Sequence, residues 1–186
     1  MANADRPSGF TPRRHAFGGV IRANPYKISD AYATGLFTGD MVVLTSGYLA
    51  IGAQDSSVPL GIFSGCQYTT TDGEVKFSKT WPAAQATLGA GNNTIAWVYD
   101  DPGIVYTVQS DTGTAYVHAT HIGGVFDIEL DHAGNTITGQ SGMELDLSDT
   151  GTGQWLVLGL ADEPGNAVGV NAKLEVKLAV SLVQGT

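Results

Sequence analysis

Turn-forming residues divide this sequence into short segments, and this division constrains the fold more than any other feature. The pair Asp72-Gly73 can supply the positive φ angles of a type I′ turn, which joins two antiparallel strands. Pro102-Gly103 fits the central positions of another tight turn. The first turn would join residues 62–70 to residues 74–81, and the second would join residues 94–99 to residues 104–109. We therefore expect two hairpins in the middle of the chain.

The C-terminal part carries the clearest strand pattern. Apolar residues alternate there with charged ones, namely Leu174, Val176, Leu178 and Val180 with Lys173, Glu175 and Lys177. A period of two places the apolar side chains on one face of a strand and the charged ones on the other. Similar segments recur along the chain, including one over residues 41–44 that returns at Ser46-Gly47. The sequence predicts an all-β fold, a β-barrel or β-sandwich of about nine to twelve short antiparallel strands. One helical turn fits residues 28–37, and another fits residues 82–93.

Charge is distributed unevenly along the chain. Residues 1–30 hold five Lys and Arg against two Asp and Glu, whereas the whole chain carries −9, so residues 31–186 are strongly acidic. An acidic body repels nucleic acid, and we expect no nucleic-acid partner. Residues 1–20 show neither strand nor helical period. The sequence predicts an extended N-terminal arm over residues 1–20 and a β domain over residues 21–186, with the glycine-rich stretch 133–142 as an alternative boundary.

Histidines and carboxylates are the candidate metal ligands. His118 and His121 lie three residues apart, a spacing that brings both rings to one face of a helix but to opposite faces of a strand. The surrounding residues favour a strand, so we expect no metal there. Acidic residues alternate with apolar ones in two further segments, at Asp127, Glu129 and Asp131 and at Glu144 and Asp146. Two such rows side by side would repel, so we expect them apart on a solvated outer face. The alternative is a calcium site or a surface for a basic partner.

The residues that could support catalysis are few. Cys66 is the only cysteine, which excludes an intramolecular disulfide, and the apolar run beside it predicts a small core residue. Asp100 and Asp101 are neighbours in a turn and do not converge as an acid and a base must. Residues 89–91 (Gly-Ala-Gly) lack the lysine and the strand–helix setting of a phosphate loop. We predict that the chain is not an enzyme and needs no cofactor.

The sequence shows no targeting or membrane segment. It begins without an apolar run behind a positive charge, so no secretory signal is expected. Nowhere does it approach the roughly 18 apolar residues of a membrane helix, and we expect no membrane partner. We therefore expect the protein to be made in a cytoplasm and to be used there or in a particle assembled there.

Several stretches of turn and strand residues form a recognisable set. They are GFTPRRHAFGGVIRANPYKI at residues 9–28, YATGLFTGD at 32–40, LGIFSGCQY at 60–68, KTWP at 79–82, VYDDP at 98–102, GNTITGQSGMELD at 134–146 and LGLADEPGNAVGVNAKLEVKL at 158–178. This set resembles the head-decoration (cement) proteins of tailed phages, notably marine ones. The resemblance implies a virion protein that binds the outer surface of the major capsid protein lattice. It also implies a homotrimer that links neighbouring capsomers and so stabilises the capsid.

The basic arm suits such a role. Phe10 and Phe17 would make apolar contacts with the major capsid protein, and Arg13 and Arg14 would pair with its carboxylates. On this hypothesis residues 1–20 order on the capsid, and the alternative is a frayed tail. The protein would then be located on the capsid surface of a virion assembled in the host cytoplasm.

The tryptophans leave a second function open. Trp81, Trp97 and Trp155 are either core residues or exposed residues that serve subunit association. Exposed aromatic side chains on a β-sandwich also suit sugar binding. The alternative function is therefore a receptor-binding or carbohydrate-binding component of a head fibre or tail.

Overall fold

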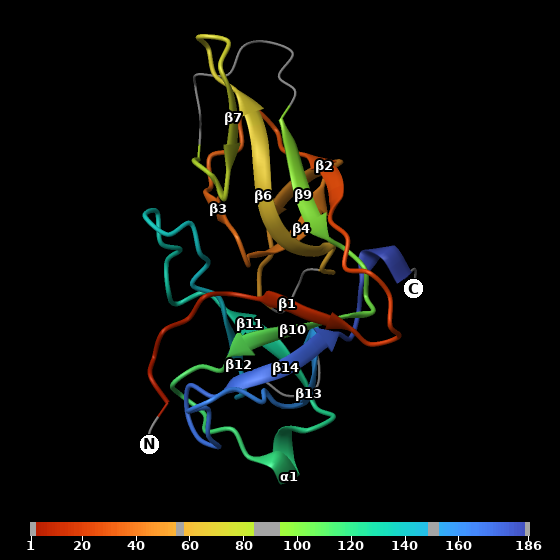
Figure 1. Cartoon of the computed structure of the whole chain (residues 1–186), viewed down its shortest axis with the longest axis vertical. Coiled ribbons are helices and arrows are strands. Elements are labelled where there is room, and N and C mark those ends of the chain that lie inside the picture. Colours follow the sequence, from red (N-terminus) through yellow and green to blue (C-terminus); the bar gives the residue numbers. More distant parts are fainter. Residues whose placement is uncertain (1–2, 55–57, 84–93, 149–152, 185–186) are drawn as a thin grey trace.

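The fold is built almost entirely from antiparallel strands (Figure 1). The computed structural model describes residues 3–54, 58–83, 94–148 and 153–184. These ranges contain fourteen strands, one helical turn, α1 (His118–His121), and one 3-10 turn, η1 (Leu182–Gln184). The all-β class predicted from the sequence is confirmed. The structure has more strands than the expected number of about nine to twelve. Several of them have only two or three residues, too few to show an alternating pattern in the sequence.

Residues 24–99 form one half of the molecule, which we call the insert lobe. Its strands are β2 (Asn24–Lys27), β3 (Leu36–Phe37), β4 (Met41–Thr45), β5 (Tyr48–Ile51), β6 (Gly61–Thr69), β7 (Val75–Ser78), β8 (Thr80–Trp81) and β9 (Ile95–Tyr99). Five of them follow the order β2-β9-β6-β4-β5, with β7 paired to β6, and β3 and β8 form a separate ribbon. The edge strand β5 lies close to β2, so the sheet curls toward a barrel.

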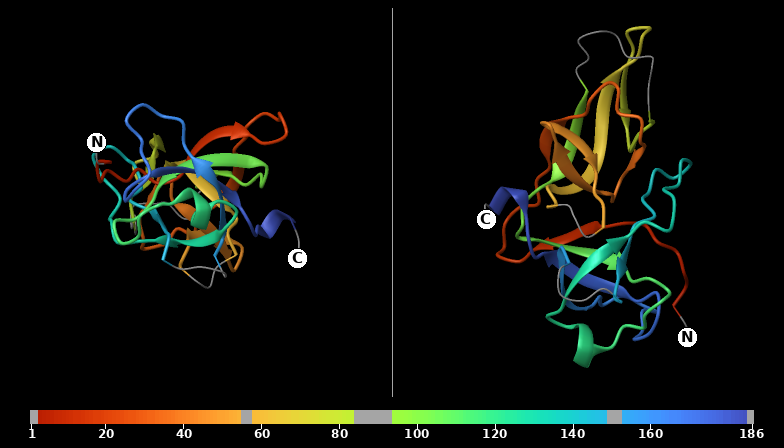
Figure 2. Two further views of the ribbon diagram at one scale, coloured as in Figure 1. Left: turned by 90° about the horizontal axis from the view of Figure 1, so that it is seen from below. Right: turned by 180° about the vertical axis from the view of Figure 1, so that it is seen from behind.

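The remaining strands form the terminal lobe, which lies below the insert lobe along the long axis (Figures 1 and 2). They are β1 (Thr11–His15), β10 (Ile104–Gln109), β11 (Val125–Glu129), β12 (Glu144–Asp146), β13 (Trp155–Leu160) and β14 (Lys173–Leu178). Their order is β1-β10-β14-β13-β11-β12. A parallel bridge between Ser110 and Leu145 brings the far strand β12 back beside the end of β10. This sheet is therefore strongly curled as well.

Two predicted strand returns are confirmed. At Ser46-Gly47 both residues have positive φ angles, 52° and 85°, and β4 pairs with β5 across this two-residue turn. Strands β6 and β7 also pair as predicted, around Asp72-Gly73. Of these two residues only Gly73 has a positive φ (83°), and its N–H donates to the carbonyl of Thr70. The turn is therefore a type I turn with a glycine bulge instead of type I′.

The second predicted hairpin, over residues 94–109, is wrong in its pairing. The turn forms, since the N–H of Ile104 donates to the carbonyl of Asp101. However, β9 pairs with β2 and β6 in the insert lobe, whereas β10 pairs with β1 and β14 in the terminal lobe. The turn at Pro102-Gly103 therefore connects β9 of the insert lobe to β10 of the terminal lobe, and the two strands do not form a hairpin.

Each lobe has its own apolar cluster. The insert cluster includes Phe63, Trp81 and Val98, and the terminal cluster includes Phe126 and Trp155. The full terminal cluster is Phe10, Met41, Ile62, Ile104, Tyr106, Val108, Tyr116, Phe126, Ile128, Met143, Leu145, Leu147, Trp155, Val157, Ala172, Leu174, Val176 and Leu178. It contains Met41 and Ile62 from the insert lobe, so the two lobes share buried contacts. The β domain predicted for residues 21–186 thus has two cores.

The lobes meet at a waist where three segments cross, around residues 8–10, 38–41 and 139–143. The N–H of Phe10 donates to the carbonyl of Gly39 at 2.9 Å, and Thr38 forms a parallel bridge with Gln140. Gly9 has a φ of +68°, and a Cβ there would lie 2.5 Å from the Cβ of Ser141. The glycine-rich stretch 133–142, considered above as a boundary, therefore joins the lobes instead of separating them.

The helical expectations met mixed outcomes. Residues 28–35 contain only a turn, in which the N–H of Tyr32 donates to the carbonyl of Ser29, and residues 36–37 form β3. Most of residues 82–93 lie outside the described residues. Residues 118–121 form a helical turn where a strand was expected, and the strand begins only at Val125, after Gly123-Gly124.

Candidate functional site

The four residues predicted to contact a capsid differ in their exposure. Phe10 is 1% exposed and stacks on the buried Trp155, with ring centroids 4.1 Å apart and planes 22° from parallel. Burial of a phenylalanine on a tryptophan stabilises the fold and removes that ring from the surface. The expectation that Phe10 is a surface anchor is therefore corrected, because it belongs to the terminal core. Phe17 is 83% exposed and is available for contact.

The two arginines already have partners within the chain. Arg13 Nη1 lies 2.6 Å from Glu163 Oε1, and Arg14 Nη2 lies 2.7 Å from Glu175 Oε2. Lys173 pairs with Glu163 as well, and these cations hold the pKa of the Glu163 carboxyl below its usual value. Exposed pairs of this kind contribute at most about 1 kcal/mol each, so a partner could still replace them. Contact of these residues with a capsid stays a prediction.

The N-terminal segment is not a free arm in this structure. Residues 11–15 form β1, which pairs with β10 from Thr11 opposite Thr107 to His15 opposite Ile104, with a shift of register at Arg13. Asn3 makes side-chain hydrogen bonds to the backbone of Ala167. Residues 3–15 therefore lie along the terminal lobe, and only the connection around Phe17 extends away from it. The predicted boundary at residue 20 does not mark where the chain joins the fold.

A group of apolar side chains lies on the outer side of the insert sheet, and we call it the aromatic face. It consists of Val75 and Phe77 on β7 and Ile95 and Trp97 on β9. Gln67 of β6 pairs with both Phe77 and Ile95, which places these residues on one side of the sheet. Phe77 is 74% exposed, and its ring lies 6.3 Å from that of Trp97 at 17° from parallel. Trp81 and Trp155 are core residues, so Trp97 alone of the three reaches this surface.

The outer side of this sheet carries the apolar residues of the aromatic face, with Gln67 and Thr69 of β6 between β7 and β9. Residues that alternate with the aromatic face, such as Cys66, Ala96 and Val98, are buried in the insert core. An antiparallel sheet normally presents polar side chains to water on its outer side. Contiguous exposed apolar side chains are typical of interaction surfaces. The aromatic face is thus a candidate binding surface. The sequence analysis named only Trp97 among its residues, because the alternation of β7 does not reveal which side of that strand is covered.

The two acidic rows lie side by side, contrary to the expectation that they are apart. In the pairing of β11 with β12, Asp127 is opposite Asp146 and Glu129 is opposite Glu144. Asp127 and Glu144 are buried. Burial, a hydrogen bond with Asp131 and nearby carboxylates raise the pKa of Glu129 to about 7. Sequence spacing showed each row but could not show that the rows are paired.

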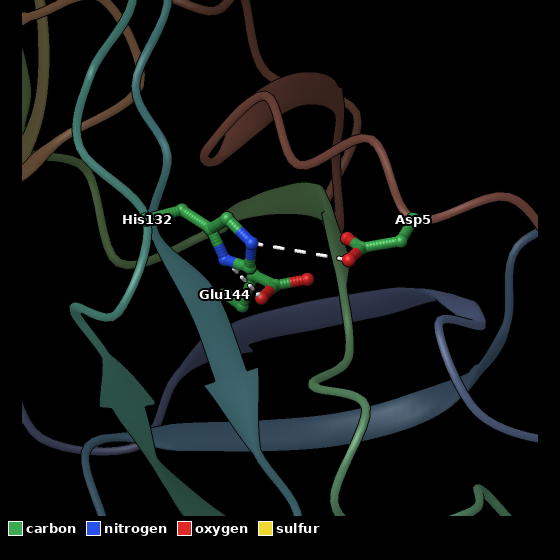
Figure 3. Close-up of side chains that lie close together, drawn as sticks. All are labelled: Asp5, His132 and Glu144. Atoms are coloured by element: carbon green, nitrogen blue, oxygen red, sulfur yellow. Dashed lines mark ion pairs between the residues drawn. The ribbon is translucent and has the colours of Figure 1, made fainter.

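One end of these rows meets the N-terminal segment in a polar cluster of Asp5, Gln109, His132 and Glu144 (Figure 3). Nδ1 of His132 lies 3.0 Å from Oε2 of Glu144, and Nε2 lies 3.8 Å from Oδ2 of Asp5. Nε2 of Gln109 donates to Oδ1 of Asp5 (3.1 Å) and Oε1 of Glu144 (2.9 Å). Burial raises the pKa of Glu144, and the hydrogen bond from Gln109 and the His132 ring oppose that rise.

This cluster is a possible metal site. One possible ligand atom from each of Asp5, His132 and Glu144 lies within 4.8 Å of the other two, and it is the one such group among the described residues. None of these three residues was a metal candidate from the sequence except Glu144, as part of an acidic row. Asp5 and His132 are far apart in the sequence, so only the fold brings them together.

The other histidine candidates have structural roles. His118 and His121 lie on α1, so the prediction that they lie on a strand and point to opposite faces is wrong. Nδ1 of His118 lies 3.1 Å from the Tyr116 hydroxyl, and Nδ1 of His121 accepts the N–H of Val117 at 2.9 Å. Both rings also contact the ring of Tyr116. His121 is thus a buried, hydrogen-bonded side chain, whereas His118 is exposed and packs against Tyr116 from the surface.

The remaining candidates from the sequence are also accounted for by packing. Cys66 is buried, as predicted, and burial raises the pKa of its thiol to about 12. Asp100 accepts hydrogen bonds from Asn24 and from the hydroxyl of Tyr26. Asp101 instead accepts the N–H of Gly103 and pairs with a histidine of β1. The glycine stretch at 89–91 lies outside the described residues.

Comparison with known proteins gives no relative. No protein-family model matches the chain, and neither a curated protein nor a solved structure matches it. Among the described residues, no helix is long and apolar enough to cross a membrane. The likeness to phage decoration proteins therefore remains a resemblance of sequence patterns.

Proposed function

We propose that this chain is a structural protein of a virus particle, which binds the outer surface of the major capsid protein lattice and stabilises it. The observation that carries the proposal is the aromatic face, an exposed apolar surface on a sheet whose other side is a packed core. Four parts of the proposal rest on the sequence resemblance: the virus particle, the major capsid protein as partner, the homotrimeric state and the location on the capsid surface. The proposal assigns no catalytic step and no cofactor to the chain.

The aromatic face has the chemistry of a protein contact. Covering Phe77 and Val75 with apolar groups of a partner removes their area from water, which contributes about 25 cal/mol per Å². Aromatic residues are enriched at the centre of such interfaces, where single side chains contribute about 2 kcal/mol or more. Lys27 and Pro25 on the neighbouring strand β2 are exposed beside this face and would form its rim.

Phe17 offers a second contact at a different place. It lies in the connection between β1 and β2 and packs edge-on against His15, with ring centroids 5.9 Å apart. A protein that links neighbouring capsomers needs at least two separate contacts. The aromatic face lies on the insert lobe and Phe17 lies in the connection between the lobes, so the two contacts are separate and meet this need.

The test is reconstitution on particles that lack the protein. Phe77→Ser should weaken binding to assembled heads about thirtyfold, the effect of losing about 2 kcal/mol at an interface. Ile137→Ser is the matched control, because Ile137 is 93% exposed but belongs to the loop between β11 and β12 and not to the aromatic face. Occupancy is measured by quantitative gel analysis of purified heads. Equal occupancy of wild type and Phe77→Ser, with both folded, would contradict the proposal.

One observation favours a second candidate, a carbohydrate-binding component of a head fibre or tail. The nearly parallel rings of Phe77 and Trp97 form an apolar ledge on which a sugar ring could stack. Binding of the isolated wild-type protein to a glycan array, lost in Phe77→Ser, would support this candidate. Binding to heads without binding to any glycan would support the capsid proposal instead.

A further inference from the structure

The cluster of Asp5, His132 and Glu144 has a charge distribution that attracts a cation. In the described part of the chain, His132 is the one ion-pair partner of both carboxylates. An imidazole carries at most one positive charge, so two carboxylates leave the cluster negative. Glu144 is only 2% exposed and lies opposite another carboxylate, Glu129, in the β11–β12 ladder. A buried carboxylate without full compensation is costly, and a bound cation removes that cost.

The ligand chemistry selects the cation. Histidine nitrogen together with carboxylate oxygen suits Zn²⁺ or a similar transition metal, whereas Ca²⁺ and Mg²⁺ prefer oxygen ligands alone. Nε2 of His132 and Oδ2 of Asp5 are 3.8 Å apart, and two metal bonds of about 2.0–2.2 Å span that gap. The side chains of Asp5 and His132 are partly exposed, so they can adjust to an ion and water can complete its shell.

Glu144 and Gln109 fix the orientation of the two ligands. The 3.0 Å separation between Nδ1 of His132 and Oε2 of Glu144 is a hydrogen-bond distance, so the ring donates its Nδ1–H to this carboxylate. A carboxylate that holds the far nitrogen of a ligating histidine is a usual feature of zinc sites. Gln109 donates to Asp5 Oδ1, which leaves Oδ2 directed toward the ring (Figure 3).

We propose that Zn²⁺ binds between Asp5 and His132, with Glu144 as the residue that positions the histidine, and that the ion fastens the N-terminal segment to the β11–β12 connection. Asp5 belongs to the segment that precedes β1, and His132 follows β11 in the chain. The ion would therefore join two segments that the sequence separates by more than a hundred residues. This inference does not depend on the proposed function.

The test is titration of the full chain, stripped of metal by a chelator, with Zn²⁺ followed by calorimetry. We expect one saturable site per chain and a rise in the unfolding temperature on addition of Zn²⁺. Asp5→Asn and His132→Gln should abolish this site, whereas Glu144→Gln should weaken it about tenfold to hundredfold, the range for residues behind a ligand. Asp72→Asn is the control, since Asp72 is exposed in the β6–β7 turn of the insert lobe, and its affinity should equal that of wild type.

A second measurement separates the site from other histidines and from misfolding. The N–H of Arg6 donates to the side chain of Gln109, so Zn²⁺ should slow hydrogen exchange at Arg6 in wild type but not in Asp5→Asn. Asp5 lies at the surface, and its substitution should leave the fold intact even if His132→Gln does not fold. The absence of saturable binding, or equal affinity in Asp5→Asn and wild type, would overturn the proposal and leave His132 as an ion-pair partner of two carboxylates.

Discussion

The carboxyl group of Asp40 is buried at the waist, and its burial should make the stability of the protein depend on pH. Asp40 is 3% exposed, and its Oδ2 accepts the N–H of Phe37 at 2.7 Å. Burial raises the pKa of this carboxyl from 3.8 to about 6, although hydrogen bonds with Ser141 and Phe37 act in the opposite direction. The folded chain therefore holds this proton more tightly than the unfolded chain does.

The sign and size of the effect follow from this difference. Between about pH 4 and pH 6 the folded state binds more protons than the unfolded state at this group, so its contribution to stability falls as pH rises through that range. The difference between 3.8 and about 6, at about 1.36 kcal/mol per pH unit, is about 3 kcal/mol. Above pH 6 this full amount acts against folding, because the buried carboxylate is charged.

Asp40→Asn removes the charge and keeps an oxygen that can accept the N–H of Phe37. We expect the variant and wild type to have similar free energies of unfolding at pH 4, and the variant to be more stable by up to about 3 kcal/mol at pH 8. Urea unfolding followed by tryptophan fluorescence, at intervals of one pH unit, measures both. Asp72→Asn in the exposed β6–β7 turn is the control and should show no such divergence. Parallel curves for wild type and Asp40→Asn from pH 4 to pH 8 would refute the reasoning.

Two further predictions concern the N-terminal segment. Phe10→Ala should lower the free energy of unfolding by about 3–5 kcal/mol in urea titrations, because it leaves a cavity beside Trp155. The control Phe17→Ala should change this free energy by less than about 0.5 kcal/mol. Similar losses in the two variants would show that Phe10 is not in the core. Gly9→Ala should destabilise the fold more than Gly47→Ala in the same assay. Both glycines have positive φ, but only at Gly9 would a Cβ meet other atoms. Equal effects of the two substitutions would contradict the close crossing at the waist.

Local sequence patterns predicted the strands but not their partners. The alternation over residues 173–178 correctly predicted β14, and Ser46-Gly47 correctly predicted a two-residue turn. Both structures depend on residues that are neighbours in the chain. The pairing of β9 and β10 failed for the opposite reason. A turn at Pro102-Gly103 fits a hairpin and a passage between lobes equally well, and the distant strands β1 and β14 decide between them.

The N-terminal segment shows the same limit in another form. Proline, glycine and arginine gave residues 1–20 the appearance of an arm. Phe10 nevertheless stacks on Trp155, and residues 11–15 pair with β10, which attaches the segment to the terminal lobe.

Of the cluster of Asp5, His132 and Glu144, the sequence indicated only Glu144, as part of an acidic row. The residues of this cluster come from three segments with no shared spacing, and the repulsion between acidic rows argued against the pairing that occurs.

The attachment of the insert lobe has a mechanical consequence for the proposed function. Its two connections leave the terminal lobe from paired positions, since His15 is opposite Ile104, and the N–H of Ala16 donates to the carbonyl of Gly103. Nε2 of His15 also lies 3.1 Å from Oδ2 of Asp101, so hydrogen bonds join the two connections to each other. These two connections alone would allow the insert lobe to rotate relative to the terminal lobe. The crossing at the waist and the shared burial of Met41 supply a second attachment, which prevents rotation about the first. A pull on the aromatic face is therefore carried into the terminal sheet by two separate routes, as a protein that reinforces a lattice requires.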